Sequence, residues 1–202
     1  MYDPNSLAIR AGVSGRLGEA SPDRSASIID LGCGGGLLLN RLHEMGFRQL
    51  AGLGWTIAVP PNGTAVGEVD LTVPGWADRL DGRTFDCVVA TEVLEHLVNP
   101  YQFLLEARKL TAANGRLILT FPNVHSWRSI VGYAVAGRFS GFFGPNWNDN
   151  HPLFDQHIFI PNIHLVRYFL QLNKFEIVSI RYLHGSSRLF GQTTMLEARA
   201  IP

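Results

Sequence analysis

The sequence predicts an α/β fold with a seven-stranded, mostly parallel sheet, helices on both faces and an antiparallel hairpin at one edge. Three observations support this prediction. Short apolar runs alternate with helical patterns along the chain. Several of these runs contain almost no polar residues, as expected of parallel strands buried on both faces. Two β-rich runs near the carboxyl end are not separated by a helical pattern, which favours a hairpin.

Strands and helices alternate from residue 27 onward. Residues 27–31 form an apolar strand that is followed by glycines and then by a helical pattern over residues 37–42. A second strand is predicted at residues 49–53, a third at 65–70 and a fourth at 85–90. The segment 56–64 contains Pro60, Pro61 and Gly63, so we expect its crossover helix to be very short or absent.

The second half of the chain continues the pattern. Pro100 to Leu110 is predicted as an amphipathic helix that begins after Asn99. Residues 114–115 form an Asn-Gly turn before a fifth strand at residues 116–121, which Pro122 ends. A helix over residues 162–172 precedes two strands, at residues 175–182 and 193–200, which are expected to pair as the edge hairpin.

The domain organisation follows from length and local composition. A chain of 202 residues suits one domain with a full core, which we assign to residues 27–202. Residues 1–26 show only a weak helical pattern and are expected to form an arm or a lid over the site. Residues 123–153 are rich in Gly, Trp, Phe and Asn, and we interpret this insertion as a cap over the substrate.

Composition restricts the partners. Lysines plus arginines and aspartates plus glutamates each total 17 and no basic run occurs, so nucleic acid is not expected as a partner. Neither an apolar leader nor an 18-residue apolar stretch is present, so we expect a soluble, cytoplasmic protein, monomeric or homodimeric, with no membrane partner. Cys33 and Cys87 are not expected to form a disulfide.

The run from Asp30 to Gly36 is the strongest indication of a ligand site. It has the form D-x-G-x-G-x-G, and glycines allow a backbone to approach a ligand closely. A dinucleotide fingerprint would need a third glycine at the position of Leu37. The run instead resembles motif I of the class I S-adenosylmethionine methyltransferases.

Residues 85–100, FDCVVATEVLEHLVNP, strengthen this resemblance. They are similar to the F-D-x-V-x-x-x-x-V-L-E-H-L-x-D-P signature of the same group, and residues 120–139 resemble the corresponding stretch of MetW-type proteins. The likeness covers residues 27–182. It implies a Rossmann-like sheet, S-adenosylmethionine as cofactor with S-adenosylhomocysteine as product, and methylation of an oxygen or nitrogen of a small molecule. The aromatic residues of the expected cap favour an aromatic or otherwise apolar acceptor.

The resemblance also assigns cofactor-binding residues. The methionine half of the cofactor is expected at the glycine run, the adenine at the end of the third strand, and the sulfonium beside the fourth strand. Trp55 is expected either to stack on adenine or to pack in the core. Family members usually carry an acid that binds the ribose at the position of Gly54, so its absence predicts weak binding. Glu44, Glu68 or an ordered water are the candidates to bind the ribose in place of that acid. The full cofactor set is Asp30, Gly32, Cys33, Gly34, Gly36, Trp55, Asp70, Leu71, Thr91 and Glu92.

His96 and His157 are the candidate catalytic residues, since a histidine can take a proton from a hydroxyl or amine near neutral pH. His125 and His151 are rival bases. Glu92, Glu95 and His96 also have the E-x-x-E-H form that plant small-RNA 2′-O-methyltransferases and some ubiquinone-biosynthesis O-methyltransferases pair with a later histidine to hold a divalent ion. His157 would complete that set here, but many relatives carry the motif without a metal, and no metal site is predicted.

Two other functions stay open at this point. The missing acid at Gly54 and the reduced second crossover are compatible with a catalytically silent methyltransferase fold that acts as a binding or regulatory protein. The possible metal set is compatible with 2′-O-methylation of RNA, although the chain lacks the basic surface run that RNA binding favours.

Overall fold

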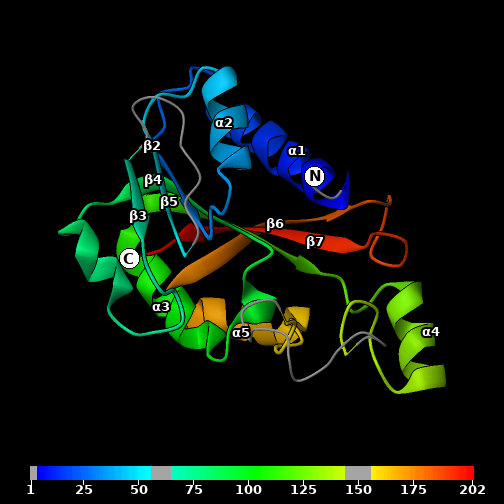
Figure 1. The fold of residues 1–202 in the computed structure, drawn as a ribbon. Coiled ribbons are helices and arrows are strands. Elements are labelled where there is room, and N and C mark those ends of the chain that lie inside the picture. The colour runs from blue at the N-terminus through cyan, green and yellow to red at the C-terminus, as the bar shows by residue number, and fades with distance from the viewer. Residues whose placement is uncertain (1–3, 56–64, 144–155) are drawn as a thin grey trace.

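The computed structural model describes residues 4–55, 65–143 and 156–202. Its strands form one seven-stranded sheet in the order β3-β2-β1-β4-β5-β7-β6 (Figure 1). The strands are β1 (Ile28–Leu31), β2 (Leu50–Gly54), β3 (Ala65–Glu68), β4 (Phe85–Thr91), β5 (Thr111–Pro122), β6 (Phe175–Leu183) and β7 (Thr193–Ala200). The predicted strands are therefore confirmed, including the hairpin, in which β7 lies between β5 and β6.

Strand directions place the ends of the parallel strands at one edge. β1 pairs in parallel with β2 and β4, and β4 pairs in parallel with β5. β7 runs antiparallel to both β5 and β6. The strand order reverses between β1 and β4, and an open α/β sheet binds ligands at the carboxyl ends of strands on either side of such a reversal. Asp30 and Thr91 lie at those ends.

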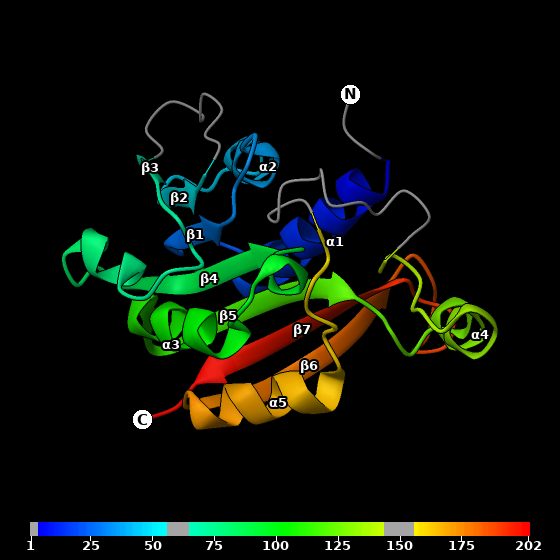
Figure 2. The same cartoon turned by 60° about the horizontal axis from the view of Figure 1, so that its bottom comes forward.

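Helices cover both faces of the sheet (Figure 2). On one face lie α1 (Pro4–Ala20) and α2 (Leu37–Glu44), whose apolar residues Val13, Leu17 and Leu38 join one buried cluster. On the other face lie α3 (Pro100–Leu110) and α5 (Ile163–Leu172), which bury Phe103, Leu104 and Val166 in a second cluster. Two short 3₁₀ helices, η1 (Trp76–Leu80) and η2 (Leu94–His96), also pack on that second face.

The amino-terminal segment is more ordered than its sequence pattern indicated. Most of it forms α1, which buries Ile9, Val13 and Leu17. The Arg16 side chain of α1 forms an ion pair with the buried Glu197 of β7 at 2.7 Å. The weak amphipathic signal concealed the helix, because α1 contains glycines and arginines and owes its position to contacts with distant strands. The first residues of α1 also reach the carboxyl edge of the sheet.

Two smaller features differ from, or lie beyond, the expectations. β5 begins at Thr111 rather than at residue 116, because the predicted turn at Asn114 forms an irregularity within the strand, where the register with β4 shifts. Asn114 has a φ of 61°, which suits an asparagine. The expected short crossover at residues 56–64 lies outside the described residues, as do Trp147, His151 and Phe154 of the expected cap. Cys33 and Cys87 are free and buried.

α4 (Trp127–Ala136) stands apart from the two helical layers, beyond the end of the sheet (Figure 1). In the ranges that the structure describes, no helix combines the length and apolar character needed to cross a lipid bilayer.

Candidate functional site

The turn after β1 has a conformation that requires glycine. Gly32, Gly34 and Gly36 have φ values of 79°, 46° and 72°, in the left-handed region that other residues rarely adopt. The N–H groups of Gly32 and Cys33 both donate to the Leu53 carbonyl oxygen of β2, at 2.7 and 3.1 Å. The turn is thereby fixed against the neighbouring strand, and α2 begins directly after Gly36.

Asp30 lies beneath this turn, one residue before the end of β1. Its side chain is buried, and burial raises the pKa of its carboxyl to about 7, while the positive charge of Arg10 acts in the opposite direction. A buried carboxyl that binds protons near neutral pH is stabilised as a carboxylate by a cationic ligand group. Asp30 therefore suits a ligand that carries an ammonium group.

A cavity of about 470 Å³ opens beside the turn, and we call it the cofactor cavity. It brings together the ends of β1, β2 and β4 with the residues after β3. Trp55 leaves 45% of its surface exposed, so it forms part of the wall rather than of the core. The cavity is lined by Arg10, Gly32, Gly34, Gly54, Trp55, Val69, Asp70, Leu71, Thr72, Glu92, Val93, His96 and Leu97.

Asp70 is held in place on this wall by Thr72. Both the backbone N–H and the hydroxyl of Thr72 donate to Oδ1 of Asp70, at 2.8 and 2.6 Å. The side chain of Leu71 is buried beside it. A fixed carboxylate next to an apolar side chain can accept a hydrogen bond from an amino group on a planar ring that packs against that side chain.

Gly54 also lines the cofactor cavity, and within residues 4–55, 65–143 and 156–202 neither Glu44 nor Glu68 joins it there as a substitute for the expected acid. A β-carbon on Gly54 would lie 3.4 Å from the backbone nitrogen of Cys33, so the glycine turn occupies the adjoining space. Glu44 and Glu68 line other hollows of the surface. Within the described part of the chain, the acids that line the cofactor cavity are Asp70 and Glu92.

Cys33 and Gly36 support the turn without lining the cavity. Cys33 is buried, and a β-carbon on Gly52 would lie 2.9 Å from its sulfur, so the thiol packs beneath the sheet end against β2. Gly36 precedes the first residue of α2 in a left-handed conformation. Their predicted role in cofactor binding is therefore indirect in this geometry.

The end of β4 is strained at Glu92, which has a φ of 52°. Its backbone N–H is held by Thr120, whose carbonyl oxygen and hydroxyl oxygen lie at 3.1 and 3.0 Å. Burial raises the pKa of the Glu92 carboxyl to about 7. The preceding residue, Thr91, is 6% exposed, and its hydroxyl has no hydrogen-bond partner among the described residues.

His96 and His157 are neighbours, as the sequence hypothesis required. Their rings meet edge to face with centroids 4.8 Å apart, and Nδ1 of His96 lies 3.1 Å from the Gln156 carbonyl oxygen. His96 lines the cofactor cavity, and His157 lines neither of the two cavities of the site. Burial and the nearby His96 lower the pKa of His157. The rival base His125 contacts Arg188 at 3.3 Å instead.

Glu95 completes a compact group with these two histidines. The ligand atoms of Glu95, His96 and His157 all lie within 4.8 Å of one another. Glu95 is fully buried, and neither of its carboxyl oxygens has a hydrogen-bond donor within the described ranges. Burial and the adjacent Glu92 raise its pKa well above the usual range. Three of the four suspected metal ligands are thus together, and Glu92 is not part of the group.

A second cavity, of about 450 Å³, adjoins the first and is called here the acceptor cavity. The two share Arg10, Gly32 and Glu92, and Thr91 lines only the second. Arg10 was not predicted as a site residue, because the amino-terminal segment contains no recognised motif. The remaining lining residues are Asn5, Ser6, Ile9, Pro122, Asn123, Ser126, Arg128, Ser129, Ser140, Gly141, His184, Gln192 and Thr193.

Among the described residues, the aromatic side chains of the expected cap do not line this cavity. Tyr133 and Phe139 stack on each other with centroids 4.8 Å apart, and Phe142 is buried against His157. Trp127, the first residue of α4, is 45% exposed. The side chains around the acceptor cavity are mainly hydroxyl, amide and guanidinium groups.

Comparison with known proteins identifies relatives for most of the chain. The profile of a family described as "Methyltransferase domain" matches residues 8–180. The ubiquinone biosynthesis O-methyltransferase of Rickettsia conorii is 31% identical over 130 residues, which cover 60% of this chain and 44% of that protein. The mitochondrial enzyme of the same name from Arabidopsis thaliana is 34% identical over 115 residues, which cover 52% and 34%. The chain thus spans less than half the length of these curated relatives.

Solved structures share the fold. Magnesium protoporphyrin IX methyltransferase from Synechocystis, crystallised with bound S-adenosylhomocysteine, superimposes with a TM-score of 0.67 at 21% identity, over 96% of this chain and 83% of that one. The 1,6-didemethyltoxoflavin-N1-methyltransferase of Burkholderia thailandensis gives a TM-score of 0.64 at 15% identity, over 96% and 79%.

Proposed function

The chain belongs to the methyltransferase domain family, and from this premise we propose that it transfers a methyl group from S-adenosylmethionine to an oxygen or nitrogen of a small molecule. The observation that carries the proposal is the pair of adjoining cavities. One has the groups that the cofactor needs, the other is large enough for a small acceptor, and they meet at Arg10, Gly32 and Glu92. The acceptor's reacting atom would lie at this junction.

Residues that line the cofactor cavity, together with Asp30, which is buried and is not part of the lining, match the cofactor's chemical groups. S-adenosylmethionine carries an ammonium and a carboxylate at its methionine end, for which Asp30 and Arg10 offer opposite charges. Its adenine would pack between Trp55 and Leu71 and donate its amino group to Asp70. The ribose has no dedicated acid at Gly54, so binding would depend mainly on the two ends of the molecule.

The protein's part in the transfer is alignment and removal of a proton. Bound S-adenosylmethionine supplies a methyl group already activated on a positively charged sulfur. Gly32 and the strained backbone at Glu92 would hold the two reactants in line and exclude water between them. Glu92 lines both cavities and titrates near pH 7, so it is placed to take the acceptor's proton, with His96 as the alternative base on the cofactor side.

A divalent cation would fit the group formed by Glu95, His96 and His157, since the Glu95 oxygens are buried without donors and imidazole and carboxylate ligands suit such ions. Of the three residues, His96 lines the cofactor cavity, so an ion bound there would lower the pKa of a hydroxyl that reaches that cavity. This is a proposal additional to methyl transfer, and the transfer itself does not depend on it.

Calorimetric titration with S-adenosylmethionine and S-adenosylhomocysteine tests the proposed function. Both should bind, and Asp30→Asn should weaken S-adenosylmethionine about 10- to 100-fold, because a charge-assisted hydrogen bond contributes about 1.5–3 kcal/mol. Arg167→Ala, an exposed change on α5 outside both cavities, serves as the control and should bind as the native protein does. Absence of measurable heat at millimolar ligand would overturn the proposal.

A further inference from the structure

We propose that the acceptor cavity binds a small molecule with an anionic group, a carboxylate or a phosphate, held by Arg128 and the first turn of α4. The inference rests on the proposed function and names the class of its acceptor. It places the anion at the α4 end of the cavity and the methyl-accepting atom at the other end, beside Glu92.

The charges around the acceptor cavity favour an anion. Arg10 and Arg128 both line it, and Glu92 is its one acidic lining residue within the described ranges. Arg10 faces the cofactor side, where its charge acts on Asp30 and Glu92. Arg128 is exposed to solvent, and its guanidinium lies 5.7 Å from the centre of the Trp127 ring. No acidic side chain of the described residues forms an ion pair with Arg128.

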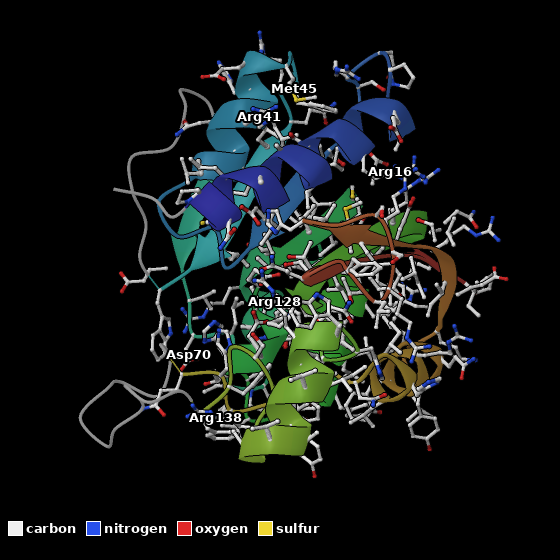
Figure 3. All side chains as sticks on the ribbon, turned by 90° about the vertical axis from the view of Figure 1, so that its right-hand side faces the viewer. Arg16, Arg41, Met45, Asp70, Arg128 and Arg138 are labelled. Atoms are coloured by element: carbon white, nitrogen blue, oxygen red, sulfur yellow. The ribbon has the colours of Figure 1, made fainter. Side chains whose placement is uncertain are left out.

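α4 presents its amino-terminal end to the cavity. Ser126, Arg128 and Ser129, from its cap and first turn, all line the cavity, and Figure 3 shows Arg128 at the end of α4 nearer to α1 and Arg138 toward the far end. The Ser126 hydroxyl accepts from the Ser129 N–H at 3.3 Å, so this end is capped. The partial positive charge of a helix amino terminus adds to that of the guanidinium.

The wall that carries this helix end is fixed in position. Asn123 precedes the cap, and its side-chain amide donates to the carbonyl oxygens of Arg188 and Gly191 at 2.7 and 2.8 Å. The Trp127 N–H donates to the Leu189 carbonyl oxygen at 2.8 Å. These bonds tie the start of α4 to the loop between β6 and β7, so Arg128 projects from an anchored turn.

Thr91 gives a second, independent indication of a polar ligand. Thr91 lines the acceptor cavity and is only 6% exposed. Its hydroxyl has no hydrogen-bond partner among the described residues. Buried hydroxyls in folded proteins nearly always have a partner. An acceptor with a hydroxyl or amino group at the junction would satisfy it, whereas a purely apolar acceptor would leave it unpaired.

A binding screen on the S-adenosylhomocysteine-loaded protein tests the inference. The probes are matched pairs that differ in charge: 4-hydroxybenzoate with 4-hydroxybenzamide, lactate with lactamide, and phenyl phosphate with phenol. Thermal shift ranks them and calorimetry measures the affinities. We expect at least one acid to bind at least tenfold more tightly than its neutral partner, and the carboxylate and phosphate arms identify which anion is preferred.

Variants then locate the binding group. Arg128→Ala should weaken the acid about 10- to 100-fold and leave S-adenosylhomocysteine affinity unchanged, and Arg167→Ala should change neither. The inference is overturned if no acid binds at 5 mM, if neutral partners bind equally well, or if Arg128→Ala retains full affinity. Failure of S-adenosylhomocysteine itself to bind would instead refute the proposed function.

Discussion

A β-carbon built on Gly32 would lie 2.7 Å from Cγ2 of Val93, closer than real β-carbons approach. The glycine turn after β1 and the segment after β4 therefore fit together only because residue 32 has no side chain. Gly32 also has a φ of 79°, which L side chains rarely adopt. The two motifs that resemble methyltransferase signatures thus form one packed unit at the junction of the two cavities.

Gly32→Ala should lower the free energy of unfolding by about 2–4 kcal/mol, since left-handed backbone strain and overpacking each cost about 1–2 kcal/mol or more. It should also reduce affinity for S-adenosylhomocysteine. Urea unfolding and calorimetry measure the two effects. Gly15→Ala is the control, because a β-carbon there meets nothing within 4 Å in the middle of α1, and it should be neutral or stabilising.

Adding Val93→Ala to Gly32→Ala separates the two causes. The double variant removes Cγ2 and relieves the steric contact, but the backbone strain stays. We expect the double variant to lose about 0.5–2 kcal/mol less unfolding free energy than the sum of the losses of the two single variants, the range for residues in contact. Strict additivity would show that the contact has no energetic consequence.

The sequence predicted most of the sheet because each parallel strand contains a mainly apolar run and is followed closely by a glycine, a proline or an acid. α3 matches its predicted bounds because Asn99 caps it, its side chain accepting from Gln102 N–H at 3.1 Å. α1 was not predicted as a full helix. Its position depends on the ion pair between Arg16 and Glu197, residues 181 positions apart, which no local pattern reveals.

The candidate site was predictable only where its residues belong to local sequence motifs. Asp30, Gly32 and Glu92 lie in recognisable motifs at strand ends, whereas Arg10, Ser126 and Gln192 line the acceptor cavity from α1, α4 and the segment before β7. These elements come together only through the tertiary fold. The described aromatic residues of the expected cap include Tyr133 and Phe139, which stack on each other, and Phe142, which packs on His157, so they do not reveal the polar lining of the acceptor cavity.

Glu197 carries a carboxylate that is buried and paired with arginines. It is buried in β7, accepts from Arg16 at 2.7 Å and is also paired with Arg116. Burial alone would raise the pKa of Glu197, but the hydrogen bonds from the two arginines outweigh it and lower the pKa. Arg16→Met should cost about 1.5–3 kcal/mol of unfolding free energy, because Glu197 loses one charge-assisted hydrogen bond and keeps those from Arg116 and the Ser179 hydroxyl.

The same pair predicts a pH dependence. A lowered folded-state pKa adds stability above the ordinary value of 4.5 and loses it as pH falls through the folded-state pKa. Glu197→Gln should therefore flatten the acid side of a plot of unfolding free energy against pH. Arg199→Met, which removes the exposed pair with Glu176, is the control and should change stability by less than about 1 kcal/mol. Equal losses in the two arginine variants would contradict the assigned role of Glu197.

Asp30 should make cofactor binding depend on pH. Its pKa is raised from 3.8 to about 7, so the ligand-free fold keeps a proton there that the unfolded chain releases, and stability falls as pH rises through this window. Pairing with the ligand's ammonium needs the ionised form, so S-adenosylmethionine affinity should rise between pH 6 and 8.

Two variants identify the titrating group in calorimetric titrations across this range. Glu92 lines the cofactor cavity, and burial also raises the pKa of its carboxyl to about 7. Glu92→Gln should retain the rise in affinity and Asp30→Asn should abolish it. The reverse pattern would assign the dependence to Glu92.

The group of Glu95, His96 and His157 should bind a divalent cation, because its ligand atoms lie within 4.8 Å of one another. Free Mn²⁺, measured by electron paramagnetic resonance, should decrease on addition of the protein. Glu95→Gln and His157→Ala should each weaken binding at least tenfold, because each removes one of three ligands within 4.8 Å of one another. His125→Ala is the control. It removes a histidine that lies outside the group, so this variant should bind Mn²⁺ as the native protein does. If Mn²⁺ at 1 mM does not bind, or binds equally to all variants, the three side chains act as buried packing around Glu95, and proton removal falls to Glu92 without assistance from a metal.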